Sequence, residues 1–297
     1  MSGRIDSGRA SPRPAHRAAK NEHGGPSSAR SNVARGQPAD RTRARTSTRD
    51  GALVFEATPV HEHEPQTESH QARIRDTLAL LPDDCESLLE VGCGPGYLLR
   101  RAPVARAFGT DLSQRSLEQL SRPGAVATLL DLPFAAGSVD TVLCAETLEH
   151  LDPTVLRAAA AELTRVARRY VLVSVPNREQ LLASSRRCPH CGTVFHVHGH
   201  RTSFDEARLR ALFPMARRVE VRGCWRVQPF SPALLWARTT VFDLWKHTRF
   251  TVCPSCGNQR FEDQRRRLTY RLFNAANTIV NPRRSQWNWL LLRAELE

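Results

Sequence analysis

Short apolar runs alternate with segments of helical periodicity through most of the chain. The runs that suit buried strands are residues 87–92, 104–110, 125–130, 139–144, 170–175, 217–222 and 287–293. The segments that suit helices lie at 66–81, from Tyr97, at 113–120, after Asp152 and after Ser203. Strands that alternate with helices form βαβ units and a parallel sheet. The pattern therefore predicts an α/β fold with a mostly parallel seven-stranded sheet and helices on both faces.

Helix starts can be predicted from capping chemistry. Ser113 suits an N-cap, and Asp152 suits an N-cap with Pro153 at the first helical position. The stretch from Ser203 to Glu206 has the form of a capping box. Residues 232–246 carry an apolar, aromatic helical pattern, which favours a lid packed on the domain over a helix lying on a membrane surface.

Positive charge is concentrated at the start of the chain. Residues 1–50 hold ten arginines and one lysine against four acidic residues, while the whole chain of 297 residues has a net charge of +13. This stretch is rich in Ser, Pro, Gly and Arg and has few large apolar side chains, which predicts a disordered basic tail ahead of a folded domain at 51–297. The tail is either a solvated extension or a contact for RNA, DNA or acidic lipid. It lacks the apolar core of a secretory signal, and no run approaches the ~20 apolar residues of a membrane span, so we expect a cytoplasmic protein.

A glycine-rich loop follows the first predicted strand. It reads Glu90-Val-Gly-Cys-Gly-Pro-Gly96, and ligands of open α/β sheets bind at the carboxyl ends of such strands. Asp111 ends the second predicted strand, where a carboxylate can accept hydrogen bonds from two ribose hydroxyls. Asp131 ends the third, where it can accept from an adenine amino group. A nicotinamide dinucleotide site is disfavoured because its third glycine would stand at Tyr97.

With these motifs, residues 66–176 resemble the class I S-adenosylmethionine (SAM)-dependent methyltransferase superfamily. The matching stretches are LLEVGCGPGYLL, GTDLS, Asp131–Val142 and Ala145–Leu151. The resemblance implies a Rossmann-like fold with strand order 3-2-1-4-5-7-6, the last strand antiparallel, and SAM as cofactor. It also implies that the glycine loop holds the methionine moiety, that Asp111 binds the ribose and that Asp131 lies by the adenine. The full set of expected cofactor-binding residues is Glu90, Gly92, Cys93, Gly94, Gly96, Asp111, Leu112, Asp131 and Leu132.

Candidate proton acceptors follow the fourth predicted strand. Methyl transfer from a sulfonium requires a positioned acceptor and, for a hydroxyl or carbon acceptor, removal of a proton. Glu146, Glu149 and His150 are the candidate catalytic residues, and His150 is the natural titrating group near pH 7. The alternative is that these residues only begin a helix. Cys144 lies in an apolar run, which disfavours it as a cytosine nucleophile, and the Asn- or Asp-Pro-Pro-aromatic motif of base-amine methyltransferases is not found after this strand.

Two Cys-Pro-x-Cys-Gly units predict a structural Zn²⁺ site. Two residues between thiolates allow both sulfurs to reach one tetrahedral ion, and the four ligands are Cys188, Cys191, Cys253 and Cys256. A redox-active pair is the alternative. We expect the insertions at 186–202 and 223–285, which carry these knuckles, to form a cap on the acceptor side. The histidines between the pairs either line the acceptor pocket or replace a thiolate, and they are His196, His198 and His200.

The knuckle pattern also resembles a bacterial subgroup of methyltransferases associated with glycan or lipid-linked substrates. We therefore expect a SAM-dependent methyltransferase acting on a small-molecule, glycan or lipid-linked acceptor. One alternative is an RNA methyltransferase that uses the basic tail and the zinc module to bind phosphate. The other is a non-catalytic zinc-containing binding protein that retains the fold.

Overall fold

The computed structural model describes residues 66–246, 248, 251–281 and 285–296. The chain divides into two units, Met1–Asp40 and Arg41–Glu297, and only the second contains described residues. The predicted basic tail at 1–50 lies outside the described residues. Within the described part, none of the helices combines the length and apolar character needed to cross a membrane.

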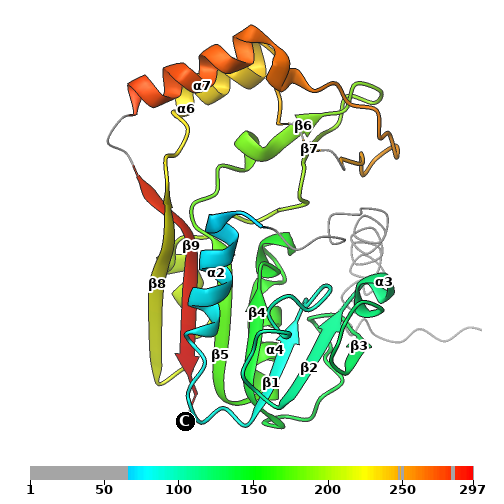
Figure 1. Ribbon diagram of the computed structural model, residues 1–297, viewed down its shortest axis with the longest axis vertical. Helices are drawn as coiled ribbons and strands as arrows, with labels where there is room; N and C mark the ends of the chain where they lie inside the picture. Colours follow the sequence, from blue (N-terminus) through cyan, green and yellow to red (C-terminus); the bar gives the residue numbers. More distant parts are fainter. Residues whose placement is uncertain (1–65, 247, 249–250, 282–284, 297) are drawn as a thin grey trace, which may run out of the picture. The chain divides into compact units, whose positions relative to one another are not determined.

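A seven-stranded mixed sheet forms the centre of the described unit (Figure 1). Its order is β3-β2-β1-β4-β5-β9-β8, with β9 antiparallel to both neighbours and the first five strands parallel. The strands are β1 Ser87–Val91, β2 Arg106–Asp111, β3 Gly124–Val126, β4 Val139–Ala145, β5 Ala167–Pro176, β8 Arg218–Val227 and β9 Gln286–Glu295. The predicted strand order and the antiparallel last strand are therefore confirmed.

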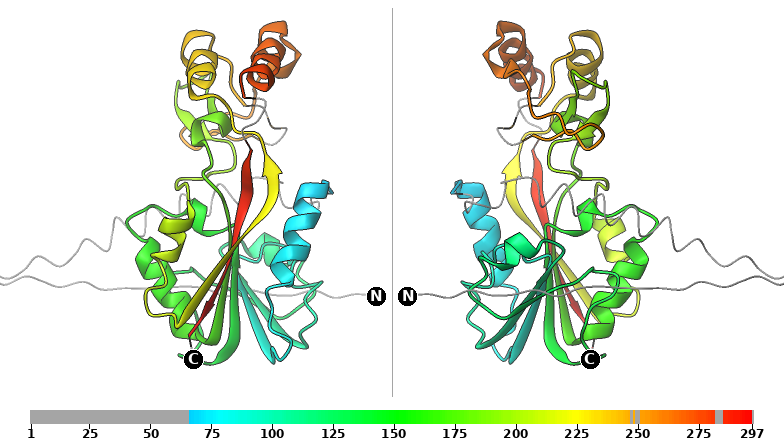
Figure 2. Two further views of the ribbon diagram at one scale, coloured as in Figure 1. Left: turned by 90° about the vertical axis from the view of Figure 1, so that its left-hand side faces the viewer. Right: turned by 90° about the vertical axis from the view of Figure 1, so that its right-hand side faces the viewer.

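Helices cover both faces of this sheet, as Figure 2 shows. One face packs against α4 Leu156–Val166 and α5 Glu206–Arg210, which bury side chains such as Leu163 and Leu209. The other face packs against α2 Glu68–Leu78 and the turns that follow the glycine loop. The short helix α3 Gln114–Leu117 lies against β2 and β3. The predicted arrangement, with helices on both faces of the sheet, is confirmed. Parallel strands that are buried on both sides need such cover.

Several predicted helix boundaries are wrong. The helix expected from Tyr97 is a series of turns. Asp152 accepts from the backbone N–H of Thr154 in a local turn, so α4 begins only at Leu156. The cap of α5 is Asp205, which accepts from the N–H of Arg208, and not Ser203.

The third strand and the aromatic helix are also shorter than predicted. β3 ends at Val126 because Thr128 and Asp131 pair in a separate turn. In the 232–246 segment, α6 Pro232–Trp236 passes into a π-helical turn at Ala237–Val241 and then ends.

A smaller hairpin and two helices extend beyond the carboxyl end of the sheet (Figure 1). The short helix η3 Leu181–Ser184 leads into strands β6 Ser185–Arg187 and β7 Val194–His196, which pair antiparallel. Helix α7 Leu268–Val280, preceded by the short helix η5 Gln264–Arg266, lies beside α6. The rings of Phe242 and Phe273 meet edge to face at 5.1 Å, and the N–H of Ser231 donates to Asn277 at 2.7 Å.

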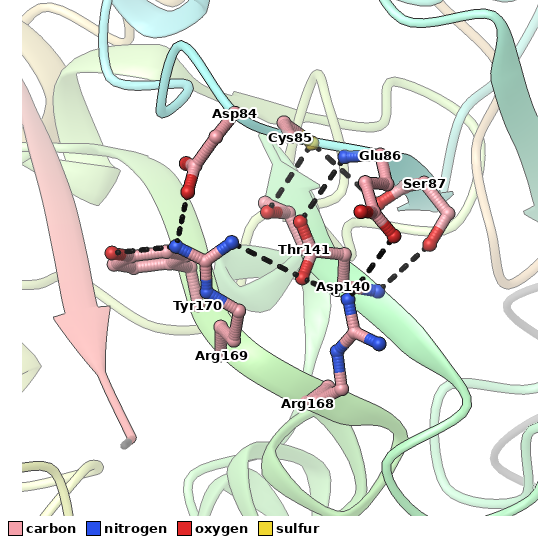
Figure 3. Close-up of polar contacts among 9 residues, drawn as sticks. All are labelled: Asp84, Cys85, Glu86, Ser87, Asp140, Thr141, Arg168, Arg169 and Tyr170. Atoms are coloured by element: carbon pink, nitrogen blue, oxygen red, sulfur yellow. Dashed lines mark hydrogen bonds and ion pairs between the residues drawn. The ribbon is translucent and has the colours of Figure 1, made fainter.

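An ion-pair network closes the opposite, amino-terminal edge of the sheet (Figure 3). The carboxylate of Asp140, buried at the start of β4, accepts hydrogen bonds from the guanidinium of Arg168 at 2.9 Å and from the N–H of Glu86 at 3.2 Å. The backbone N–H of Asp140 donates to the hydroxyl of Ser87. A buried carboxylate needs charged or hydrogen-bonding partners, and these contacts supply them within the scaffold. We therefore assign this acidic residue to the scaffold rather than to a functional site.

Candidate functional site

The glycine loop turns sharply between β1 and the ends of two neighbouring strands. Gly92 and Gly96 adopt φ of +72° and +77°, which side chains rarely tolerate. A Cβ at Gly92 would lie 2.3 Å from Oγ1 of Thr147, and one at Gly96 would lie 2.2 Å from Leu120. The N–H of Gly92 donates to the carbonyl of Thr110 at 2.7 Å. The loop therefore requires glycine at both positions, and it brings the ends of β1, β2 and β4 together.

Asp111 is held against this loop by its own carboxylate. One oxygen accepts from the N–H of Gly94 and the other from the N–H of Ser113, both at 2.8 Å. Each oxygen keeps a second lone pair for a ligand hydroxyl. Leu112 is half-buried beside it, and Cys93 is buried, which raises the pKa of its thiol. The structure thus brings the predicted loop and the predicted ribose-binding acid into direct contact.

A buried carboxyl group and a buried guanidinium group lie close to the loop. Glu90 is buried in β1, and burial raises the pKa of its carboxyl to about 8, against the N–H of Leu99 and the guanidinium of Arg73, which lower it. Arg73 of α2 is 9% exposed and lies 5.7 Å from the ring of Trp289. Among the described residues, Oε2 of Glu90 and both Nε and Nη1 of Arg73 have no hydrogen-bond partner. Orphaned buried polar atoms of this kind are expected where a polar ligand binds.

Replacing Glu90 by glutamine is expected to flatten the dependence of stability on pH. Between the ordinary pKa of 4.5 and about 8, the folded chain keeps a proton that the unfolded chain releases. The free energy of unfolding of the ligand-free protein should therefore fall as pH rises through this window, by up to about 1.4 kcal/mol per pH unit. Urea unfolding from pH 5 to 8 tests this, with the exposed Glu118→Gln as control. Parallel curves for wild type and Glu90→Gln would contradict it.

Asp131 and Leu132 lie five and six residues beyond the end of β3 at Val126. Asp131 is exposed and pairs in an isolated bridge with Thr128. Leu132 is buried, and its N–H donates to Glu162 at 2.8 Å. The roles of these two residues beside an adenine stay predictions.

Glu146 follows β4 in a strained conformation with φ of +52°. Its carboxylate accepts from the indole N–H of Trp289 at 2.8 Å and from the hydroxyl of Ser174 at 3.1 Å. Its N–H donates to the carbonyl of Ser174 at 2.8 Å. A non-glycine residue at positive φ costs of order 1–3 kcal/mol and persists where its surroundings fix it, often at functional sites. The structure therefore fixes this carboxylate at the carboxyl edge of the sheet.

Glu149 and His150 lie in the short helix η2 Leu148–His150. Burial, followed by the charge of Glu146, raises the pKa of Glu149 well above its usual range. Burial, followed by the proximity of His200, lowers the pKa of His150 to about 3. His150 is therefore neutral near pH 7 in the ligand-free protein, and its role as a catalytic residue stays a prediction.

The histidine-rich loop after β7 is fastened to this helix. The N–H of Arg201 donates to the carbonyl of Glu149 at 2.7 Å. Glu179 bridges two histidines, with one oxygen 3.1 Å from Nε2 of His196 and the other 2.5 Å from Nδ1 of His200. Burial opposes the charged form of Glu179, but the two hydrogen bonds and the charges of both histidines together outweigh it and lower the pKa of Glu179. The acid is a site residue that sequence analysis missed.

The two cysteine knuckles meet, although 61 residues separate them. Two cross-knuckle Sγ–Sγ distances, Cys188 to Cys256 and Cys191 to Cys253, are 3.6 Å, and all four sulfurs lie within 4.8 Å of one another. Disulfides need about 2.05 Å, whereas Zn–S bonds of about 2.3 Å in a tetrahedron place sulfurs about 3.8 Å apart. The donor set and its geometry therefore fit Zn²⁺.

Residues 89–173 match the sequence profile of a family described as "Methyltransferase domain". The match begins in β1 and ends in β5, so it includes the glycine loop and Asp111. No curated protein matches the chain.

Solved structures of methyltransferases are similar to this chain. One is a SAM-dependent methyltransferase from Archaeoglobus fulgidus, with a TM-score of 0.49, 16% identity, and coverage of 76% of this chain and 92% of that one. Another, from Thermotoga maritima, is described as a possible histamine N-methyltransferase, with a TM-score of 0.46, 15% identity and coverage of 86% and 97%. A third is magnesium protoporphyrin IX methyltransferase from Synechocystis with bound SAM, with a TM-score of 0.43, 17% identity and coverage of 59% and 89%.

Proposed function

We propose that the protein is a SAM-dependent methyltransferase that binds its methyl donor at the carboxyl ends of β1 and β2. The observation that carries this proposal is the contact between Asp111 and the N–H of Gly94, in a loop where glycine is required at positive φ. Such a loop exposes backbone to a ligand, and the neighbouring carboxylate suits two adjacent hydroxyls. The family profile matches this same segment.

Arg73 and Glu90 extend this donor site beneath the loop. The buried guanidinium of Arg73 has unpartnered N–H groups, which suit the carboxylate of a methionine moiety. Glu90, which burial keeps protonated at neutral pH, adds a polar group without a second formal charge. When bound, SAM would supply an electrophilic methyl group on a sulfonium. The chain's own task is to hold that donor and to place the acceptor in line with it.

Glu146 is the residue we propose to face the acceptor. Its carboxylate is oriented by Trp289 and Ser174, and the strained backbone places it directly after β4. An oriented carboxylate can bind an acceptor hydroxyl or amine and take up its proton. We propose that Glu149 and His150 act beside it, in the manner described below.

We propose a small-molecule, glycan or lipid-linked acceptor. Support comes from apolar side chains that α6, the π-helical turn and α7 leave exposed, among them Trp236, Val241, Leu268 and Ile279. These elements extend beyond the carboxyl end of the sheet (Figure 1). A surface of this kind suits an acceptor with an apolar portion. Lipid and metabolite profiling of a deletion strain, searching for species lighter by one methyl group, would test the acceptor class. Methylated RNA species lost instead would favour the alternative acceptor.

Calorimetric titration with SAM tests the donor site directly. We expect the wild-type protein to bind it and Asp111→Asn to bind it at least about tenfold more weakly, because charge-assisted hydrogen bonds contribute about 1.5–3 kcal/mol. The exposed Asp83→Asn is the matched control and should bind as wild type. Failure of the wild type to bind would refute the proposed function. Undiminished binding by Asp111→Asn would refute this placement of the site.

A further inference from the structure

A second cluster of potential metal ligands lies apart from the cysteine knuckles. Glu149, His150 and His200 place one ligand atom each within 4.8 Å of one another. The first two lie in η2 and the third in the loop after β7, and backbone hydrogen bonds join these two segments. The rings of His150 and His200 meet edge to face, with centroids 4.8 Å apart. Neither the cysteine site nor the donor loop uses these side chains.

The strongest sign of a ligand here is the carboxyl group of Glu149. Its side chain is completely buried, and neither oxygen has a hydrogen-bond partner among the described residues. Leaving a buried carboxyl group unsatisfied is costly, and buried carboxylates are normally paired or coordinate a metal. Arg73 favours the charged form of this carboxyl group, but its contribution is smaller than those of burial and of the neighbouring acids Glu146 and Glu179, which oppose the charge. A bound cation would satisfy both oxygens at once.

His200 has the hydrogen-bond pattern of a metal ligand. Its Nδ1 lies 2.5 Å from Oε2 of Glu179, which fixes the ring and leaves Nε2 to bind an ion. Histidines that bind metals usually donate their other N–H to a carboxylate in this way. Glu179 can thus orient the imidazole through its Nδ1, on the side of the ring away from the ion, rather than bind the ion itself.

His196 is excluded from the ligand set by its own contacts. Its Nε2 bonds to Glu179, and its Nδ1 accepts from the N–H groups of His198 and His200. Both ring nitrogens are therefore occupied within the protein. The alternative grouping of Glu179, His196 and His200 is already satisfied by hydrogen bonds and needs no ion.

We propose that Glu149, His150 and Nε2 of His200 bind a first-row divalent cation, with Glu179 orienting His200. One carboxylate and two imidazoles suit Mn²⁺, Fe²⁺ or Zn²⁺ rather than Ca²⁺ or Mg²⁺. Three protein ligands leave coordination positions open, as in catalytic rather than structural metal sites.

The location of this cluster indicates what the open coordination positions of the cation would bind. Glu149 and His150 lie two and three residues beyond Thr147, whose side chain packs against Gly92 of the donor loop. A cation here would bind an acceptor oxygen beside the methyl donor and favour its deprotonated form. This role rests on the proposed methyltransferase function, whereas the metal site itself does not. The acceptor class it indicates is one with a hydroxyl or related oxygen.

Manganese binding tests the site in the full-length protein. The protein is prepared with zinc on its four cysteines, treated with a mild chelator, and titrated with Mn²⁺ while the electron paramagnetic resonance signal of free Mn²⁺ is followed. We expect the wild type to bind one Mn²⁺ per chain. Glu149→Gln and His200→Gln should each lose this binding, and Glu179→Gln should weaken it by about 10–100-fold, as loss of an orienting partner does.

His198→Gln is the matched control, because His198 lies in the same loop but belongs to neither ligand group. It should bind Mn²⁺ as wild type. Circular dichroism identifies any variant that fails to fold. If one of the two ligand variants fails to fold, the other still tests the site. Absence of Mn²⁺ binding by the wild type, or unchanged binding by a folded ligand variant, would overturn the metal site. Mn²⁺ binding without any binding of SAM would leave the metal site standing and refute the methyltransferase.

Discussion

Replacing Gly92 by alanine is expected to weaken SAM binding by roughly a hundredfold and to abolish turnover. The new Cβ would lie 2.3 Å from Oγ1 and 2.7 Å from Cγ2 of Thr147, at a φ of +72° that alanine adopts only with strain. Strain and displacement together cost about 3 kcal/mol, which corresponds to about two orders of magnitude in affinity. Calorimetry with SAM measures the loss directly.

Two further variants separate the causes of this effect. Gly137 also has a positive φ, +61°, but a Cβ there would meet nothing within 4 Å. Gly137→Ala therefore imposes backbone strain without a clash and should leave SAM binding nearly unchanged. Adding Thr147→Ala to Gly92→Ala removes the two closest atoms and should restore part of the affinity. Normal binding by Gly92→Ala alone would show that the loop does not hold the donor as proposed.

The sheet could be predicted from the sequence because its central strands are short, mainly apolar segments that are buried on both faces. Tyr170 to Val175 and Val139 to Cys144 are examples, and both lie at the predicted places. Helix starts were harder to predict because tertiary contacts overrule local capping signals. Phe204 is drawn into an extended bridge with Asn177, so the helix after Ser203 cannot begin before Asp205.

The proposed donor site was also accessible to sequence reasoning, because it depends on a local motif. The glycine loop and Asp111 are separated by few residues and one strand, and their contact follows from the parallel register of β1 and β2. The four cysteines could be predicted for a different reason: two thiolates separated by two residues have the spacing that lets both bind one zinc ion.

The remaining site residues carry no comparable signal. Trp289 meets Glu146 across 143 positions of sequence, and Arg73 reaches the site from a helix that precedes the whole motif. Glu179 is one acid among many until the fold places it between two histidines. Only the folded structure identifies such residues, because neither their spacing in the sequence nor their residue type distinguishes them from others.

Replacing Cys188 and Cys253 together by serine is expected to remove one zinc ion per chain and to loosen the two segments that carry the knuckles, residues 181–200 and 251–281. One thiolate is lost from each knuckle, and these two thiols are the buried members of the cluster. Binding of a structural zinc ion contributes directly to folding. Zinc content by mass spectrometry should fall by one equivalent, and proteolysis within these two segments should accelerate by on the order of tenfold or more.

The sheet should outlast this change, since its core packs through α2, α4 and α5 and not through the knuckles. Fragments that retain residues 87–176 are therefore expected to resist the protease. Cys85→Ser is the matched control, because this half-buried thiol lies outside the cluster and should leave zinc content unchanged. Full zinc occupancy in the double variant would show that the sulfurs meet for a reason other than metal binding. Hairpin β6–β7 would then depend on contacts such as Arg186 with the carbonyl of Lys246 at 2.9 Å and with the ring of Phe261 at 4.6 Å.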